Sequence, residues 1–566
     1  MKKILKYSFL ALVTLAACSR EKFAEMNTNP DAVLTIDPKT QFPTAALALH
    51  TNDFEAFYDY NRNINIWTLL WVQPGGNGVA FRQNIVSTGS YAYRIEDLYS
   101  RETGGVGGAM KNMQYLISLM PPDKKATYTY MNAITGVPLA YTAFYVSDLF
   151  GSIAYSDAFQ ARYTNPPNLT PKYDSQEQLY TILDNELKGI VNTLKTTSPD
   201  GQVLLGTSDL WYHGVGNEAQ NWARAANSLR LRIAMRMLKR KPDAAKAIVN
   251  EVLSDNLGPI NSRDVQWIFK GGGTTGGGGN WNPGSPSGRK DVVDFMNDTQ
   301  DPRVRMIYQK SAVTQAMFDA AKAQGKIAAS DKWRAYTGRY GSPDASKNPD
   351  KAPYVTNLSF NYNGRDTSLP MPSQIQNSIW DPTYQSKNAT RNFPVITYAD
   401  VCFMRAELAA RGVTTEDAQD WYYKGIDASM ADYNDWGKDA KVNGYQAMTA
   451  DEITAYKNQP GVKFDAANAI EQICLQQFIH LHTNSNELWA LMKRTGYPSV
   501  NGVIMKAESV SSNGVDQPLP RRWALNLPVG SDLNYTNKLQ AITDMQKDPE
   551  LGDLPDITGR VWWDKK

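Results

Sequence analysis

Residues that could carry catalysis or bind a metal are few in this chain and poorly grouped. There are only 4 histidines, at His50, His213, His480 and His482. The last two stand at positions i and i+2 of a helical pattern, so they point to different faces and cannot share a metal ion as an i, i+4 pair could. We therefore expect structural or surface histidines and no metal site.

Two glycine-rich stretches match catalytic loops only in part. Residues 271–276 fit the pattern G-x-G-x-x-G after a strand-like segment at 265–269, but more glycines and Pro283 follow where a dinucleotide site needs a helix N-terminus. Residues 284–288 carry Pro286 where a nucleophile elbow needs serine. Carboxylates are plentiful, so the sequence does not exclude a pair of catalytic carboxylates as in a glycoside hydrolase. No pattern points to two particular residues as such a pair. We predict a protein without catalytic residues or a cofactor.

Sugar binding requires fewer specialised residues than catalysis does. The chain is rich in aromatic rings that can stack on a sugar, with 14 Trp and 30 Tyr. The apolar face of a sugar stacks on an aromatic ring, and a stacked area of about 50–100 Å² contributes about 1–2.5 kcal/mol. Aromatic and polar residues of loops are the best candidates for ligand contacts. For each of them packing in the core is the alternative, and for Trp267 it is the stronger alternative. The predicted ligand-binding residues are Trp71, Asn77, Tyr91, Trp267, Asn280, Trp281 and Tyr336.

Most of the sequence has the periodicity of packed helices. The clearest segment is 217–239, where Trp222, Leu229 and Ile233 fall on one face; Trp222, like Trp489 in a later helix, is expected in the core. The region 256–392 instead carries many glycines, prolines and asparagines and should hold most loops and a few short strands. Further helical segments are expected at 44–70, 109–120, 127–150 (interrupted at 136–138), 177–194, 398–411, 417–433 and 467–494.

The charged and sulfur-containing residues fit a mainly α globular protein. The formal net charge of +2 does not favour a nucleic-acid partner. Asp400 and Glu407 lie on an otherwise apolar helical pattern, so we expect them to pair with arginines of neighbouring helices. Cys402 and Cys474 also lie in apolar helical patterns and are expected to be separate buried thiols.

The N-terminal segment indicates export. Lysines precede an apolar run at residues 7–15, and Leu-Ala-Ala then leads to Cys18. This order resembles the lipobox of bacterial lipoproteins, which implies that the Cys18 sulfur is alkylated with diacylglycerol, that the chain is cleaved before Cys18, and that the new amino terminus is acylated, as with palmitate. Several acyl chains give stable membrane attachment. We expect a signal peptide at 1–17, a lipidated tether at 18–43 and one domain at 44–566; an export signal with an incidental cysteine is the alternative.

An ordered set of short motifs runs through nearly the whole chain. The motifs lie at residues 27–30, 147–158, 222–232, 398–407, 487–489, 494–498 and 520–523. Each motif is weak alone, but their order is specific and resembles the SusD/RagB family of outer-membrane nutrient-binding lipoproteins. Ser152 and Lys493 depart from the aspartate and arginine that the family often has at these positions.

The resemblance implies a fold and a function. The fold would be a mainly α single domain in which four tetratricopeptide-like helix pairs carry a loop-rich, irregular half. The protein would be lipid-anchored to the outer membrane, face the cell surface, bind oligosaccharides and pass them to a SusC-like TonB-dependent transporter that it covers as a lid. Peptide capture, as on the RagB side of the family, and a lipid-anchored glycoside hydrolase are the alternatives. The sequence names neither the glycan nor its linkage and length.

Overall fold

The computed structural model describes residues 36–50, 56–77, 93–99, 105–161, 163–272, 283–381 and 389–566. The predicted signal peptide, Cys18 and most of the predicted tether lie outside these residues. The described chain begins with η1 (Pro38–Gln41) and α3 (Phe42–His50), and Phe42 is fully buried in the larger hydrophobic core. The packed body therefore includes Phe42, inside the segment predicted as tether.

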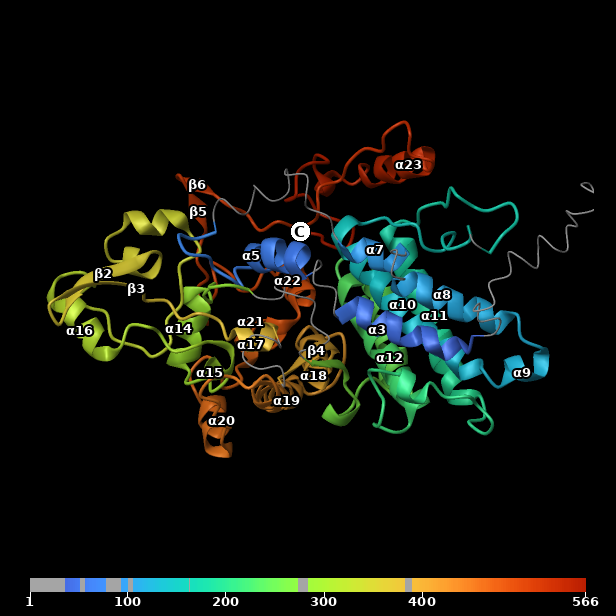
Figure 1. The fold of residues 1–566 in the computed structure, drawn as a ribbon, viewed down its shortest axis with the longest axis horizontal. Helices are drawn as coiled ribbons and strands as arrows, with labels where there is room; N and C mark the ends of the chain where they lie inside the picture. The colour runs from blue at the N-terminus through green and yellow to red at the C-terminus, as the bar shows by residue number, and fades with distance from the viewer. Residues whose placement is uncertain are drawn as a thin grey trace, which may run out of the picture.

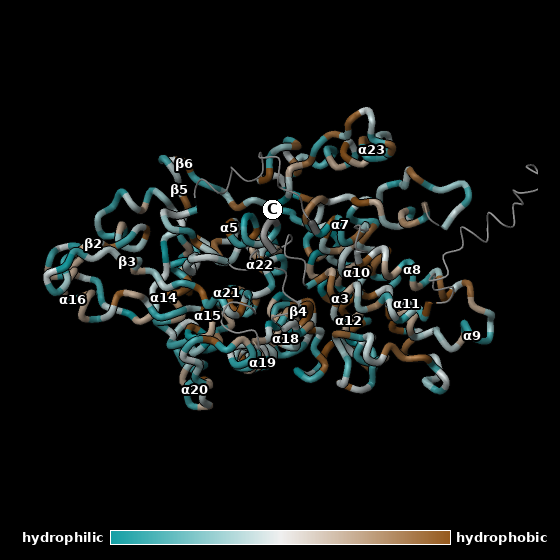
Figure 2. Tube along the Cα trace, viewed as in Figure 1, coloured by the Kyte–Doolittle hydropathy of each residue, from teal (hydrophilic) through white to brown (hydrophobic). Residues whose placement is uncertain are grey.

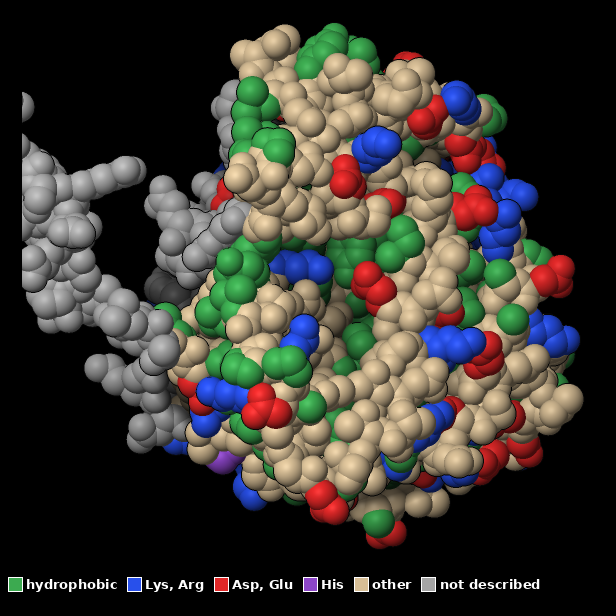
Figure 3. Space-filling model, turned by 90° about the vertical axis from the view of Figure 1, so that its right-hand side faces the viewer, with side chains coloured by type: hydrophobic (Ala, Val, Ile, Leu, Met, Phe, Trp, Pro, Cys, Tyr) green, Lys and Arg blue, Asp and Glu red, His purple; other side chains and the backbone are tan. Residues whose placement is uncertain are grey.

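One half of the molecule, on the right in Figure 1, is a stack of helices in which each long helix packs against the next. Hydrophobic and hydrophilic residues follow each other along these helices (Figure 2), as burial of one face requires. Figure 3 looks onto the outer side of this half, which is hollowed. The stack consists of α7 (Tyr93–Tyr99), α8 (Val106–Ser118), α9 (Pro122–Ala126), α10 (Thr129–Phe150), α11 (Gln176–Thr196), α12 (Glu218–Met237) and α13 (Pro242–Ser254).

Helix α11 shows how local sequence sets these elements. Ser175 accepts a hydrogen bond from the backbone of Gln178, whose side chain returns to the Ser175 N–H, so a capping box starts the helix. The buried face then repeats at helical spacing through Leu179, Leu183 and Leu187. The helical segments predicted at 177–194 and 217–239 are confirmed, and Trp222 is fully buried.

Helix α10 is continuous through Pro138, so the interruption predicted at residues 136–138 is wrong. A proline inside a helix costs about 3 kcal/mol because it removes a hydrogen bond and crowds the preceding turn. Here α8, α11 and α12 all pack against α10, and nearly its whole C-terminal part is buried. Gly136 allows the close packing, since a Cβ there would lie 2.7 Å from Cδ1 of Ile190. Tertiary burial thus outweighs the local preference.

The other half combines a smaller helical core, at the centre of Figure 1, with a loop-rich lobe on the left. The short helices of the lobe and of the chain crossing between the halves include η2 (Ala56–Ile64), α5 (Asn65–Trp67), α14 (Lys290–Asp298), α15 (Val304–Ile307), α16 (Gln315–Ala323), η6 (Pro343–Lys347), η7 (Ala352–Tyr354) and α17 (Asn377–Trp380). α23 (Tyr535–Met545) lies beside the helical stack at the upper right of Figure 1. The central helices are α18 (Tyr398–Ala410), α19 (Ala418–Asp439), α20 (Ala450–Lys457), α21 (Ala469–His480) and α22 (Ser485–Thr495).

Strands are few and short, as predicted. β1 (Trp267–Gly272) pairs antiparallel with β4 (Thr390–Ile396), so the strand expected at 265–269 starts later and runs on into the glycines. Two hairpins, β2 (Asn357–Tyr362) with β3 (Arg365–Pro370) and β5 (Ser511–Ser512) with β6 (Val515–Asp516), each turn on Asn-Gly with positive φ at both residues. Such turns match the twist of paired strands. The mainly α prediction is confirmed.

A buried charge network joins the two halves. Arg236 of α12 binds Asp148 of α10 at 3.1 Å and Glu487 of α22 at 2.9 Å. Arg232 of α12 reaches Asp400 of α18 at 3.3 Å. All of these side chains are at most 8% exposed, so each charge depends on its partners, because an unpaired charge in the interior is costly.

The predicted pairing of Asp400 and Glu407 with arginines is confirmed. Glu407 of α18 is fully buried and binds Arg494 of α22 and, at 2.8 Å, Arg411. Burial by itself opposes the charged carboxylate, but these two guanidinium groups outweigh it and lower the pKa of Glu407 to about 2. Both acids therefore hold helices together.

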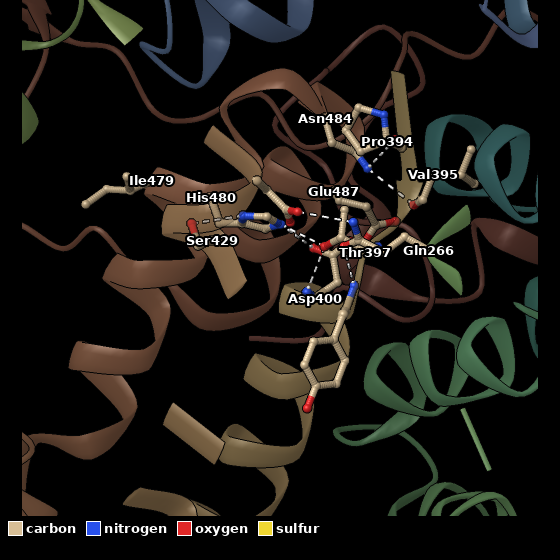
Figure 4. Close-up of polar contacts among 12 residues, drawn as sticks. Gln266, Pro394, Val395, Thr397, Asp400, Ser429, Ile479, His480, Asn484 and Glu487 are labelled. Atoms are coloured by element: carbon tan, nitrogen blue, oxygen red, sulfur yellow. Dashed lines mark hydrogen bonds and ion pairs between the residues drawn. The ribbon is translucent and has the colours of Figure 1, made fainter. Parts of the chain in front are cut away.

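The histidines are structural or exposed, as predicted. Figure 4 shows His480 between Thr397 and Ser429, whose hydroxyl oxygens lie 2.8 and 3.1 Å from its ring nitrogens. His482 lies 3.3 Å from the Tyr308 hydroxyl. Burial lowers the pKa of His480 to about 4, although Asp400 opposes this, and that of His482 to about 3. His50 accepts a hydrogen bond from the indole of Trp211, and His213 is exposed.

These two low pKa values predict an acid-sensitive fold. A histidine whose folded pKa lies below its unfolded value of about 6.5 binds fewer protons when folded, so its stabilisation is complete above pH 6.5 and falls as the pH drops towards the folded pKa. We expect about 1.4 kcal/mol of unfolding free energy lost per pH unit for each histidine. Urea unfolding between pH 7 and 4 measures this slope. His480→Gln should reduce the slope by about 1.4 kcal/mol per pH unit, the contribution of one proton. An unchanged slope in the variant would contradict the assignment to His480.

Cys402 and Cys474 are separate buried thiols, as predicted. Burial raises the pKa of each to about 12, so neither is a reactive thiolate at neutral pH. Over the described ranges, no helix has both the length and the hydropathy that crossing a bilayer requires.

Candidate functional site

Three of the predicted ligand-binding residues are core residues, which corrects those predictions. Trp71 and Trp267 are fully buried: Trp71 packs edge-on against Trp380 at 4.8 Å, and Trp267 against Trp222 at 5.3 Å. Asn77 is also buried, and its amide donates to the carbonyl of Trp71 at 2.7 Å while accepting from the Gln73 N–H. The loop that was expected to present Trp71 therefore folds back and closes over it.

The other predicted residues have different outcomes. Tyr336 is half-buried against the smaller core, its carbonyl accepts a hydrogen bond from Asn297, and burial raises its pKa. Tyr91, Asn280 and Trp281 lie outside the described residues. Trp267 belongs to the larger core and Trp71 to the smaller one, so the structure does not bring the predicted residues into one site.

Two adjoining cavities in the loop-rich lobe form the candidate site. Their volumes are about 1050 and 390 Å³, and both are lined by Lys290 and Asp294 of α14. We call this double cavity the α14 groove. Its walls include three distant segments, α14 itself, residues 331–354 and residues 503–511, and residues 311–318 and 459–461 also contribute.

Three aromatic side chains lie along the α14 groove. Trp333 is 36% exposed and is fixed by a hydrogen bond from its indole N–H to the carbonyl of Val313 at 3.0 Å. Tyr340 and Tyr354 meet edge to face at 6.2 Å where the two cavities adjoin. The Lys290 ammonium lies 4.5 Å from the Tyr354 ring and donates to Asp294 at 2.6 Å. The exposed ring of Trp333 is thus held in place beside polar groups.

Acidic side chains supply hydrogen-bond acceptors in the groove. Glu508 accepts hydrogen bonds from the backbone N–H groups of Gly341 and Ser342 at 2.7 and 2.9 Å. Burial raises its pKa, while these hydrogen bonds oppose the rise. Asp331 accepts from the Tyr354 hydroxyl at 2.6 Å. Each carboxylate oxygen can accept more than one hydrogen bond, so these groups can also receive sugar hydroxyls.

Basic side chains neutralise much of this acidity. Arg334 donates to Asp298 at 2.6 Å and lies 3.8 Å from Asp294. The Lys351 ammonium lies 5.3 Å from the ring of Tyr340. Within the part of the chain that the structure describes, no three His, Cys, Asp or Glu side chains are grouped to hold a metal ion. The groove is equipped for binding through stacked rings and hydrogen bonds.

The sequence contained a signal for Trp333 that the prediction missed. Trp333 stands between Lys332 and Arg334 and outside any apolar stripe, whereas buried tryptophans such as Trp222 sit in one. A large ring flanked by charges is poorly suited to the core. The choice of Tyr336 selected the right segment but a residue that packs inward.

Comparison with known proteins identifies the family. A family model described as "Starch-binding associating with outer membrane" matches residues 107–524. The chain belongs to this SusD-like family. No curated protein matches the chain in sequence.

Solved structures confirm the SusD-like fold. A chitin-binding protein superposes with a TM-score of 0.67 at 20% identity, covering 94% of this chain and 100% of its own. A chitin-binding SusD homologue from Flavobacterium johnsoniae gives 0.59 at 20% identity, covering 94% and 99%. A SusD homologue from Bacteroides fragilis gives 0.62 at 19% identity, covering 93% and 100%. The SusD-like family is one of binding proteins associated with the outer membrane.

Proposed function

We propose that this SusD-like protein binds a neutral oligosaccharide in the α14 groove and has no catalytic activity. The observation that carries the proposal is Trp333, an exposed ring held beside carboxylate and ammonium groups. A ring face for the sugar C–H surface and acceptors for its hydroxyls are the two elements that carbohydrate recognition needs.

The charges of the groove are nearly balanced. Asp294 and Asp298 are engaged by Lys290 and Arg334, while Lys332, Lys351 and Lys506 line the cavities together with Asp331, Asp344 and Glu508. No excess of either sign selects a charged sugar, which is consistent with a neutral one. The chitin-binding neighbours point in the same direction, since chitin is an uncharged polymer. One to three stacked rings with hydrogen bonds give micromolar to millimolar affinity once the entropy of association is included.

The cellular context belongs to the same proposal. Cys18 would carry the lipid that holds the protein on the outer membrane, facing the cell surface, and a SusC-like transporter would receive the sugar beneath it. Weak binding suits this role, because anchoring beside the transporter gives a high effective concentration. Tyr91, Asn280 and Trp281 stay predictions as further ligand contacts.

Calorimetry with the full chain in detergent tests the proposal against a panel of neutral and anionic oligosaccharides. We expect millimolar or tighter binding of at least one neutral glycan, no binding of its anionic counterparts and no release of reducing ends over hours. Turnover lost in Asp294→Asn or Asp298→Asn would establish a hydrolase instead. No detectable binding to any oligosaccharide of the panel would overturn the proposal of glycan binding.

A further inference from the structure

One wall of the α14 groove is a stretch of chain without helix or strand. Residues 503–510, which we call the irregular wall, lie between α22 and the β5–β6 hairpin (Figure 1), and most of them line the larger cavity. The backbone N–H groups of such a stretch need partners outside regular secondary structure. The position of the irregular wall therefore depends on the groups that supply those partners.

Two helices supply carboxylates that accept hydrogen bonds from the irregular wall. Glu471 of α21 is 3% exposed and accepts from the N–H groups of Val503 and Ile504, both at 2.9 Å. Asp291 of α14 accepts from the N–H of Glu508 at 2.8 Å. Hydrogen bonds to an ionised acceptor are stronger than those between neutral groups. These carboxylates tie the irregular wall to the helices behind it.

The side chain of Glu508 makes the connection across the groove. It is half-buried, lines the larger cavity, and accepts one hydrogen bond on each oxygen: from Gly341 N–H on Oε2 at 2.7 Å and from Ser342 N–H on Oε1 at 2.9 Å. Gly341 and Ser342 follow Tyr340, whose ring lines the same cavity. One carboxylate thus joins the irregular wall to the wall that carries Tyr340.

The charged groups around Glu508 support its carboxylate only weakly. Burial raises the pKa of Glu508, the two backbone hydrogen bonds oppose this, the charge of Asp291 adds to the rise, and Arg289 opposes it. Arg289 is shared, because its guanidinium binds Asp291 at 2.6 Å. Burial and the surrounding carboxylates raise the pKa of Tyr340 to about 12, so this phenol stays neutral. Lys506 of the irregular wall is exposed.

Other acids of the larger cavity are better supported. The salt bridge of Asp344 with Lys347 at 2.6 Å and a backbone N–H lower the pKa of Asp344 to about 2. Asp294 pairs with Lys290 at 2.6 Å. Acidification therefore neutralises Glu508 before Asp344. A protonated carboxyl turns one of its oxygens into a donor, so Glu508 would lose one of its two bonds across the groove.

We propose that Glu508 is a positioning residue of the α14 groove: its ionised carboxylate holds the irregular wall against Gly341 and Ser342, and its protonation loosens the wall and weakens glycan binding. The effect on glycan rests on the proposed function, whereas the link between the walls does not. Acidification would then favour release of the glycan.

Hydrogen exchange of the full chain in detergent tests the link between the walls without a ligand. Mass spectrometry of the peptides that contain Gly341 and Ser342 reports how well their N–H groups are protected. We expect Glu508→Gln to speed their exchange about tenfold or more at neutral pH, because the loss of a charged acceptor weakens both bonds. A direct contact between Glu508 and a sugar cannot affect this measurement.

The matched control is Glu218→Gln. Glu218 of α12 also accepts hydrogen bonds from two consecutive N–H groups, those of Leu205 and Gly206, both at 3.0 Å, and burial raises its pKa as well. It lies outside the α14 groove. Glu218→Gln should therefore leave the exchange of Gly341 and Ser342 at the wild-type rate.

Calorimetry with the best-binding glycan of the panel measures the effect on affinity at about pH 7.5 and about pH 5, on either side of a raised carboxyl pKa. We expect the wild-type affinity to fall about fivefold or more on acidification, and Glu508→Gln to bind weakly at both pH values. Glu218→Gln should follow the wild type. Circular dichroism melting shows whether each chain is folded at each pH.

The pH profile of the wild-type chain decides the matter even if Glu508→Gln fails to fold. Equal affinity at the two pH values would overturn the proposal, as would wild-type exchange of Gly341 and Ser342 in folded Glu508→Gln. Absence of binding to any glycan would overturn the proposed function of the groove, whereas faster exchange in Glu508→Gln would still support the link between its walls.

Discussion

Arg236→Met is expected to destabilise the fold by about 3–5 kcal/mol, because removing one member of a buried ion pair strands the remaining charge. The substitution keeps much of the side-chain volume but leaves Asp148 and Glu487 without the guanidinium that both contact. Asp148 is fully buried and Glu487 is 8% exposed, so water cannot replace the lost partner. The loss should therefore exceed that of any surface ion pair.

Urea unfolding followed by tryptophan fluorescence measures the loss. Lys188→Met is the matched control: its ion pair with Glu251 at 2.8 Å is almost half exposed on both sides, and such surface pairs contribute about 0–1 kcal/mol. The stability loss of Arg236→Lys should lie between those of Arg236→Met and Lys188→Met. Lysine keeps the positive charge but lacks the planar guanidinium that binds two carboxylates at once. Equal stability of Arg236→Met and Lys188→Met would show that the network does not hold the halves together.

Trp333→Ala is expected to weaken glycan binding about 5- to 60-fold. This range follows from about 1–2.5 kcal/mol for a stacked sugar ring, with about 1.4 kcal/mol for each tenfold change in affinity. Trp333 already exposes 36% of its surface, so its loss should change the melting temperature little. Calorimetry with the best-binding glycan of the panel measures the affinity.

The matched control for Trp333 is Trp421→Ala. Trp421 is half-buried and lies on α19, outside the α14 groove. The guanidinium of Arg405 covers it, 3.5 Å from the ring centroid. We expect its glycan affinity to stay within twofold of wild type. If Trp333→Ala kept its glycan affinity, Trp333 would not be the ring on which the sugar stacks. A large drop in melting temperature would show that Trp333 is a packing residue.

The predicted lipid anchor at Cys18 and the α14 groove have different roles in the proposed mechanism. In our proposal, lipidated Cys18 places the protein on the outer membrane and the α14 groove binds its ligand. Because the predicted affinity is modest, capture would depend on local concentration more than on tight binding.

The amino-acid sequence by itself determined most of the helical segments and several of the residues that join them, although the segment expected at 467–494 divides into α21 and α22. Helical periodicity placed Trp222 and Trp489 in the core, and both are fully buried. Charges on an apolar helix predicted that Asp400 and Glu407 pair with arginines, which they do. These predictions succeed because burial of one helix face is a local, repeating constraint that the order of residues records directly.

Only the tertiary structure decided which loop residues face a ligand. The turn at residues 73–77 folds back through the amide of Asn77 and buries Trp71, which the sequence alone placed in an open loop. The α14 groove joins segments near residues 290, 340 and 508. Pockets arise from contacts between residues far apart in the chain, and no local pattern encodes those distances.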